Sequence, residues 1–184
     1  MDKLGELFGP LAGPTKVEVW EKDAKPASLV LVTDDVAARL GQQMRLAIHD
    51  PIARIFWRQA VLLYVVDRNG SIWLALEEIA ERTGEIPPEF TVARQRFADF
   101  TAQLRKFGHP TLVDGQPARI AGEILLEYDE ESKTFAWEIN AKSGRYNKGA
   151  ERTEAHLNNV AEALSKLDVN LSLQPYREIA HGNS

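Results

Sequence analysis

The stretch 119–167 constrains the fold of this chain more than any other. It holds two alternating apolar segments, 119–128 and 133–141, separated by an acidic turn, which is the pattern of a β-hairpin. A basic, glycine-containing loop at 142–152 follows, and then a helix for which Thr153 is the expected N-cap. A basic loop before a helix N-terminus predicts a place for an anion, because free amides and the helix dipole both favour negative charge there.

The other segments alternate between helical and strand patterns. The expected strands are 17–20, 29–32, 61–66, 71–75 and 169–173, and the expected helices start at 33–35 and at 50–51 and span 76–83, 92–107 and 154–167. The pair Asn69-Gly70 predicts a type I′ turn. Ile52, Ile55 and Phe56 are expected to face the core. Because hairpins and helices mix without a regular βαβ order, we expect an α+β fold with a mainly antiparallel sheet.

The segment 92–107 has the most regular helical pattern. Its apolar residues recur every three or four positions, at Ala93, Phe97, Phe100, Leu104 and Phe107. Its other face carries a basic set, consisting of Arg94, Arg96, Arg105 and Lys106. That set is either a binding surface or a solvated helix face.

Composition narrows the class of protein. A chain of 184 residues fits one domain, 1–184, with 1–15 as an irregular lead-in and 176–184 as a disordered tail. There is no cysteine, which excludes disulfides and thiolate chemistry. The net charge of −5 disfavours broad DNA binding. No apolar run reaches the roughly 18 residues of a membrane-spanning helix, and no signal peptide is recognisable, so we expect a soluble protein, cytoplasmic or exported without a cleaved signal.

The loop 142–152 is the candidate anion site. Its proposed phosphate ligands are Lys142, Ser143, Gly144, Arg145, Lys148 and Arg152. Glycine lets the backbone approach an anion closely, but the loop has neither the Walker nor the Rossmann glycine pattern. A solvated basic turn is the alternative.

Two glutamates are candidates for chemistry in the hairpin. The simplest register places Ile124 opposite Trp137, and Glu123 directly opposite Glu138. Facing like charges are destabilising, so three explanations stay open. A basic group (Arg119 or Lys142) balances them, or one carboxyl has a raised pKa and acts as an acid or base. Alternatively, the register is shifted by two residues, which separates the carboxylates.

Three further residues complete the candidate site. His156, near the start of the last helix, is either a histidine at the edge of the core or a general acid/base beside a bound phosphate. Tyr146 and Asn140 flank the loop, where they would stack on or hydrogen-bond to a base or sugar. The catalytic candidates are therefore Glu123, His156 and Tyr146. No histidine has metal-ligand spacing, so we predict neither a metal site nor a cofactor.

The strings Gly122-Glu123-Ile124 and Ser143-Gly144-Arg145-Tyr146 resemble a Gly-Glu…Ser-Gly-(Arg/His)-Tyr signature of bacterial toxin or effector-like domains. The resemblance implies a site formed by Glu123, Ser143, Gly144, Arg145 and Tyr146, and it implies no particular reaction. We therefore expect a bacterial effector- or toxin-like protein that acts on a phosphate-bearing partner, a small molecule such as a nucleotide or an RNA. The alternative is a non-catalytic binding or immunity-type protein that pairs with a basic protein partner.

Overall fold

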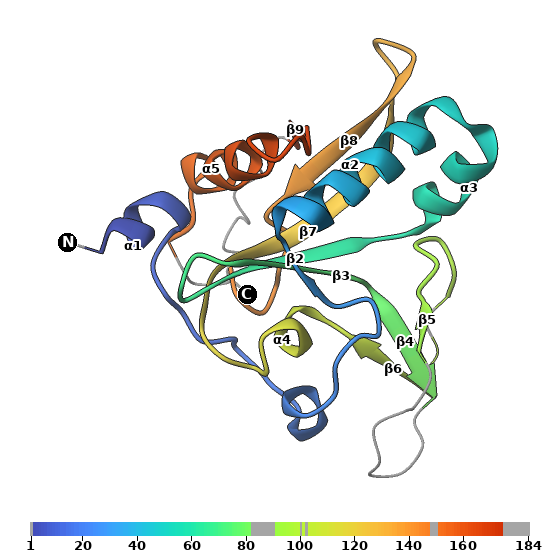
Figure 1. Cartoon of the computed structure of the whole chain (residues 1–184). Helices are drawn as coiled ribbons and strands as arrows, with labels where there is room; N and C mark the ends of the chain where they lie inside the picture. Colours follow the sequence, from blue (N-terminus) through green and yellow to red (C-terminus); the bar gives the residue numbers. More distant parts are fainter. Residues whose placement is uncertain (1, 82–90, 100, 102, 148–150, 175–184) are drawn as a thin grey trace, which may run out of the picture.

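Two β-sheets form the frame of the molecule. The computed structural model describes residues 2–81, 91–99, 101, 103–147 and 151–174. The larger sheet has the strand order β1-β3-β2-β7-β8-β9, and the smaller one β5-β4-β6 (Figure 1). The strands are β1 (Val30–Leu31), β2 (Leu62–Asp67), β3 (Ile72–Leu76), β4 (Glu78–Glu81), β5 (Val92–Ala93), β6 (Leu104–Phe107), β7 (Ala118–Asp129), β8 (Thr134–Asn140) and β9 (Ser172–Leu173). All pairs are antiparallel except β8–β9, so the α+β class with a mainly antiparallel sheet is confirmed.

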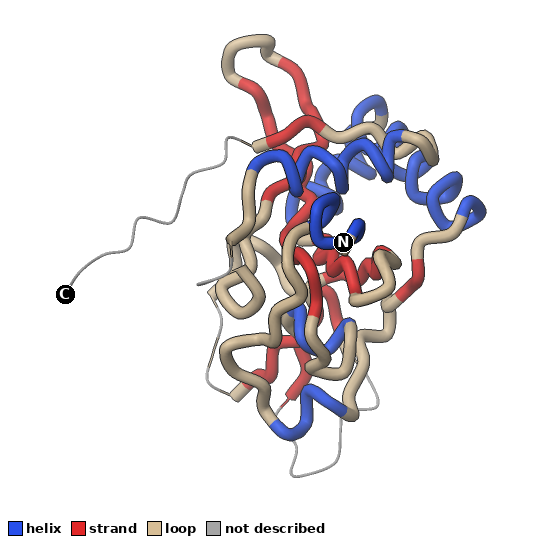
Figure 2. Tube along the Cα trace, turned by 90° about the vertical axis from the view of Figure 1, so that its left-hand side faces the viewer, coloured by secondary structure: helices blue, strands red, loops and turns tan. Residues whose placement is uncertain are grey.

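The larger sheet is covered on both faces. The helices are α1 (Lys3–Phe8), α2 (Asp34–His49), α3 (Pro51–Gln59), α4 (His109–Leu112) and α5 (Glu154–Ser165), with a 3-10 turn η1 (Val19–Lys22). One face packs against α1, α2 and α5 and the other against α4, with the smaller sheet on the same side as α4 (Figures 1 and 2). The side chains of strand β2 show that both faces of the sheet are buried. Leu62, Tyr64 and Val66 point into the first core, and Leu63 and Val65 into the second, so the whole strand is apolar.

The predicted helix starts at Thr33, Asp50 and Thr153 are confirmed. Each side chain accepts a hydrogen bond from an amide in the first helical turn, with Pro51 placed at the start of α3. Helix α5 buries one of its faces, because Leu157 and Leu164 are fully buried.

Both predicted hairpins form, with local corrections. The β2–β3 turn places only Gly70 at positive φ, so the type I′ turn was wrong. In the β7–β8 hairpin Ile124 pairs with Ile139, and Glu123 pairs with Asn140. The register is thus shifted by two residues from the simplest one, as the third explanation required, and Glu138 lies opposite Leu125.

The helices predicted at 76–83 and 92–107 were wrong. Residues 78–81 form the central strand of the smaller sheet, which takes β5 and β6 as its partners. Phe97 is 71% exposed, and Phe100 lies outside the described residues, as do 82 and 83. The helical spacing was overridden because pairing with β4 satisfies the backbone of both ends of the segment.

Four smaller predictions also need correction. The lead-in contains α1, capped by Asp2 and anchored by buried Phe8, and 17–20 enter a 3-10 turn instead of a strand. The last strand is limited to Ser172–Leu173. The apolar side chains of α3 are exposed, as described below. The tail 176–184 lies outside the described residues. Within the described part of the chain, no helix has the length and apolar character needed to span a membrane.

Candidate functional site

Gly122 lies at a close crossing of β7 and β8. A Cβ at this position would be 1.9 Å from the Asn140 carbonyl oxygen and 2.8 Å from the Tyr64 ring. The Tyr64 hydroxyl donates to the same carbonyl at 2.9 Å, which fixes the crossing. The carbonyl of Gly122 accepts a hydrogen bond from Nε2 of buried His109 at 2.9 Å. Glycine is therefore required in the Gly-Glu pair by lack of space.

The side chain of Asn140 orients Glu123. Its Oδ1 accepts from the backbone amides of Glu123 at 3.2 Å and Lys142 at 2.8 Å. Its Nδ2 donates to Glu123 Oε2 at 3.4 Å and to Gln174 Oε1 at 3.1 Å. Asn140 thus closes the end of the hairpin and holds the Glu123 carboxyl by one hydrogen bond.

The pKa of the Glu123 carboxyl is raised. Burial raises its pKa above the ordinary 4.5, and the nearby Glu77 charge acts in the same direction. The Asn140 hydrogen bond and the charges of Lys142 and Lys106 oppose the shift without cancelling it. A carboxyl with a raised pKa is a better proton acceptor than an ordinary glutamate and is more easily protonated near neutral pH.

Glu77 behaves in the opposite way. Burial by itself would raise its pKa, but Lys106 Nζ at 2.9 Å and Arg94 Nη1 at 2.6 Å outweigh burial, and the pKa falls below 4.5. Glu77 is only 5% exposed to solvent. Glu77 is therefore a fixed negative charge, whereas Glu123 is the carboxyl that changes state more readily.

His109 supports the site as a neutral ring. Burial lowers its pKa to about 4, the charges of Lys106 and Arg145 add to the shift, and the Gly122 carbonyl and Glu77 oppose it. Since Nε2 donates to Gly122, the neutral ring carries its proton there and Nδ1 is left as an acceptor. His109 is thus a fixed donor to the strand that carries Glu123.

Arg145 is held in a structural ion pair. Its Nη1 donates to both carboxylate oxygens of Glu21, at 2.6 and 2.5 Å, and Glu21 is fully buried. The Arg145 carbonyl also accepts from the Thr15 amide at 2.8 Å. The pair fastens the N-terminal segment to the loop that starts at 141.

Tyr146 and Ser143 are buried in the same loop. The Tyr146 hydroxyl donates to the Gln116 carbonyl at 2.8 Å, and burial raises its pKa well above the usual range. Ser143 Oγ accepts from the Tyr146 amide at 3.4 Å. Gly144 faces open space. The signature residues after Asn140 therefore shape the loop, and their side chains point to structural partners.

The next residue, Asn147, ties the loop to the sheet. Its Nδ2 donates to the carbonyls of Ala121 and Ala141, both at 2.6 Å, and its buried Oδ1 has no hydrogen-bond partner.

His156 and Arg152 lie at the α1–α5 contact. His156 Nδ1 accepts from the Thr153 amide at 3.1 Å in the cap of α5, and burial lowers its pKa, with Arg152 adding to the effect. Arg152 is buried and donates to the Ala118 carbonyl at 3.3 Å. A Cβ on Gly9 of the N-terminal segment would touch both side chains. The main influences on the Glu123 pKa come instead from burial and from other side chains, those of Asn140, Glu77, Lys142 and Lys106. Lys148 lies outside the described residues.

The structure thus keeps Glu123 and Lys142 together and adds Lys106, which the sequence placed in the basic set of a helix, and two residues that the sequence did not indicate, Glu77 and His109. Glu77 and Lys106 were assigned to helices, and they approach His109 only because Glu78 pairs with Phe107 across β4 and β6. No residue spacing in the sequence predicts that contact. Arg119, one of the predicted balancing groups, pairs instead with Asp2 at 2.9 Å.

Within the described ranges, no group of three or more His, Asp or Glu side chains is placed to hold a metal ion. Comparisons with protein-family models, with curated proteins and with solved structures each found no match for this chain.

Proposed function

We propose that this chain is an effector-like enzyme that acts on a phosphate-bearing substrate, a nucleotide or an RNA, with Glu123 as its acid/base group. The observation that supports the proposal is that the pKa values of two carboxyl groups shift in opposite directions. The pKa of Glu123 is raised, partly by the charge of Glu77, and the pKa of Glu77 is lowered. Enzymes that use two carboxyl groups assign them different roles by such environments.

Each residue of the cluster has a distinct task in this proposal. Glu123 takes a proton from a hydroxyl or water nucleophile in its carboxylate form and returns one in its acid form. Lys142 and Lys106, both exposed, neutralise the phosphate of the substrate. Glu77 stays ionised and holds Lys106 in place, and neutral His109 fixes the backbone next to Glu123.

We propose that the anion binds to Lys142 and Lys106 instead of Arg145 and Arg152. Arg145 is engaged by a buried carboxylate, and Arg152 is buried beneath the N-terminal segment. A phosphate bound to either arginine would have to displace these contacts. Lys142 is exposed and its charge acts directly on Glu123, so it supplies the accessible cation that the proposal needs.

The test compares Glu123→Gln with Glu162→Gln on a panel of RNAs and nucleotides. Glu162 is an exposed glutamate on α5 that accepts from Asn158, so it controls for loss of one negative charge. Glu123→Gln should lower turnover by ~10²–10⁴, and Glu162→Gln should leave it unchanged. Growth of a host that expresses each version is a second readout.

A well-folded Glu123→Gln protein with full activity would overturn the acid/base role. The non-catalytic binding alternative would then account for the molecule better. Urea unfolding of each variant separates this outcome from misfolding.

A further inference from the structure

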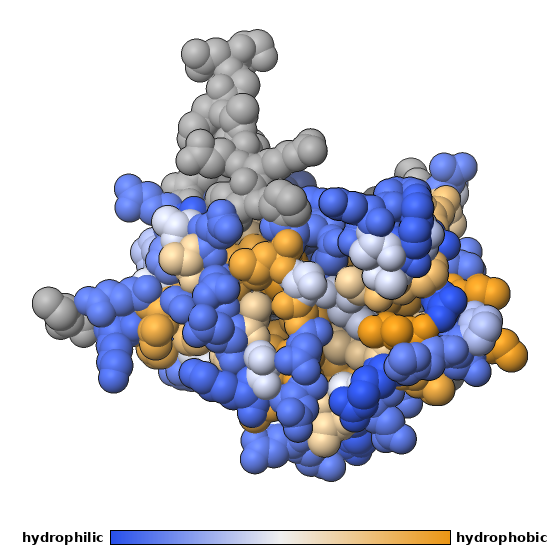
Figure 3. Space-filling view, turned by 90° about the horizontal axis from the view of Figure 1, so that it is seen from above, coloured by the Kyte–Doolittle hydropathy of each residue, from blue (hydrophilic) through white to orange (hydrophobic). Residues whose placement is uncertain are grey.

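Helix α3 exposes the apolar side chains that its sequence predicted to be buried. Ile52, Ile55 and Phe56 are 70%, 61% and 72% exposed, and no residue of α3 is buried. They lie at spacings of three and four, so they share one face of the helix. Figure 3 shows apolar residues gathered at the right-hand end of the molecule, the end at which α3 lies in Figure 1. Contiguous exposed apolar side chains mark interaction sites.

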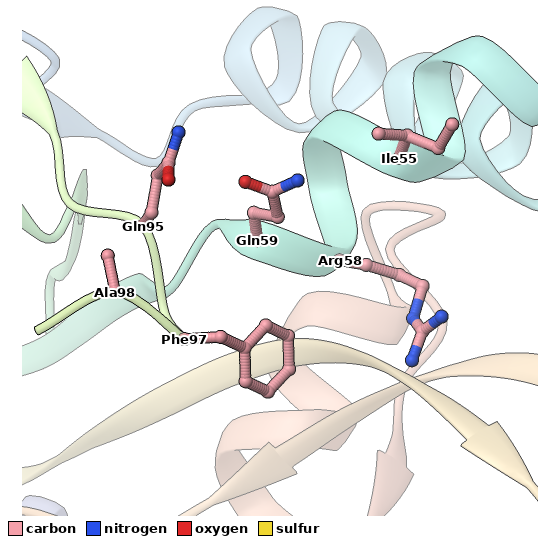
Figure 4. A pocket seen from close by; sticks show the side chains of 6 residues that line it. All are labelled: Ile55, Arg58, Gln59, Gln95, Phe97 and Ala98. Carbon is pink, nitrogen blue, oxygen red and sulfur yellow. The ribbon is translucent and has the colours of Figure 1, made fainter.

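A hollow adjoins this face. It has a volume of about 500 Å³ and is lined by Ile55, Arg58 and Gln59 of α3 and by Gln95, Phe97 and Ala98 of the loop after β5 (Figure 4). Phe97 is itself 71% exposed. The two apolar side chains therefore offer a contact site for one large side chain of a partner.

The walls of the hollow are fixed to each other. The Arg96 amide donates to the Gln59 carbonyl at 2.7 Å, which ties the loop to the end of α3. The Arg96 guanidinium also pairs with Glu127. Trp57 packs edge-on against Trp137, with ring centroids 5.3 Å apart, and so anchors α3 to the sheet. A preformed hollow reduces the entropic cost of binding.

Arg58 is the charged residue among those that line the hollow, and it is a cation although the chain carries −5. Helix α3 contains Arg54 and Arg58 and no acidic residue. The Arg54 guanidinium donates to the Ala47 and Ile48 carbonyls. Arg58 is exposed and lies over the Phe135 ring at 5.4 Å, and no carboxylate among the described residues forms an ion pair with it. A carboxylate on a partner would complement Arg58.

We infer that α3 and the loop 94–98 form a docking surface for an acidic protein segment, which places an apolar side chain in the hollow and a carboxylate at Arg58. A two-fold dimer through the same face would bring Arg54 and Arg58 against their own copies, which is unfavourable. A protein segment is therefore the occupant that both the shape and the charge favour.

The experiment is a peptide-display selection on the full chain. Peptides are selected on the wild type and counter-selected on the double variant Ile55→Ser/Phe97→Ser, with Val19→Ser as the control, because Val19 is 81% exposed and lies in η1. Enriched peptides should carry net negative charge and a large apolar residue, and they should bind the wild type and the control equally. A representative peptide should bind the double variant and Arg58→Glu at least about tenfold more weakly. A version with its acids replaced by lysine should prefer Arg58→Glu.

Three results would overturn the inference. The first is enrichment of neutral or basic peptides, or no enrichment above the double variant. The second is binding of phosphatidylserine vesicles that the double variant loses, which would identify a membrane surface. The third is self-association of the wild type that the double variant loses. Circular dichroism confirms that each variant is folded.

Discussion

The charge of Glu77 helps to raise the pKa of the Glu123 carboxyl, while Lys106 and Arg94 lower the pKa of Glu77 itself. Glu77 lies between β3 of the larger sheet and β4 of the smaller sheet, and Glu123 lies at the end of the β7–β8 pairing. Lys106 reaches Glu77 at 2.9 Å and also acts on Glu123, so it links the two groups. This arrangement is the basis of the functional proposal.

Replacement of Gly122 by alanine should be severely destabilising, whereas replacement of Gly144 should not. The Cβ at 122 would be 1.9 Å from the Asn140 carbonyl, and nothing lies within 4 Å of a Cβ at 144. We expect a loss of about 3 kcal/mol or more for Gly122→Ala and a change within about 0.5 kcal/mol for Gly144→Ala. Urea unfolding measures both. Equal losses in the free energy of unfolding for the two variants would contradict the close approach of Gly122 to the Asn140 carbonyl.

Arg145→Ala should destabilise the fold by leaving Glu21 buried and unpaired. We expect a loss of about 2–3 kcal/mol, below the range for fully buried pairs because Arg145 is partly exposed. Adding Glu21→Gln should recover most of it, since the remaining side chain is uncharged. The measurement is a double-mutant cycle in urea. An Arg145→Ala protein as stable as the wild type would return this arginine to the candidate ligands of a phosphate.

His109 should make stability fall as the pH is lowered from 6.5 to 4. The folded pKa is about 4 and the ordinary value 6.5, so in this window the unfolded chain binds a proton that the folded chain does not. The loss amounts to about 3 kcal/mol, complete below pH 4 and absent above 6.5. His109→Gln keeps a neutral donor and should remove this part of the pH dependence. Parallel curves for wild type and variant would contradict a buried neutral His109.

Inorganic phosphate should stabilise the protein through Lys142. A ligand at a hundredfold excess over its Kd adds about 2.7 kcal/mol, and a tenfold weaker Kd in Lys142→Met would remove about 1.4 kcal/mol of that. Lys166→Met at the C-cap of α5 is the control for loss of one exposed charge. The readout is the melting temperature with and without phosphate. Identical shifts in all three proteins would exclude Lys142 as the anion ligand.

The parts of the fold that local chemistry determines could be predicted from the sequence. The caps at Thr33, Asp50 and Thr153 and the two hairpins depend on neighbouring residues only. The segment 92–107 could not be predicted, because its apolar spacing fits a helix equally well and the deciding interaction is pairing with the distant strand β4.

The site was predicted only in part for the same reason. Glu123 was indicated by the Gly-Glu pair and by the conflict between two facing carboxylates, which the shifted register resolves. Lys142 was indicated by its position after the strand. Glu77, Lys106 and His109 meet through the pairing of β4 with β6 and through the contact of His109 with β7, which no spacing in the chain encodes. The apolar spacing of α3 indicated burial, but Trp57 makes its ring contact with the sheet instead.

The most direct test of the site is the titration of the two carboxyl groups, followed by carbon NMR of glutamate side chains. Assignment by Glu77→Gln and Glu123→Gln gives each pKa separately. We expect a titration midpoint above 4.5 for Glu123 and below 4.5 for Glu77. Replacement of Lys106 by methionine should raise both, because its charge favours the ionised form of each. A Glu123 midpoint at or below 4.5 would show that this carboxyl is not set apart for proton transfer.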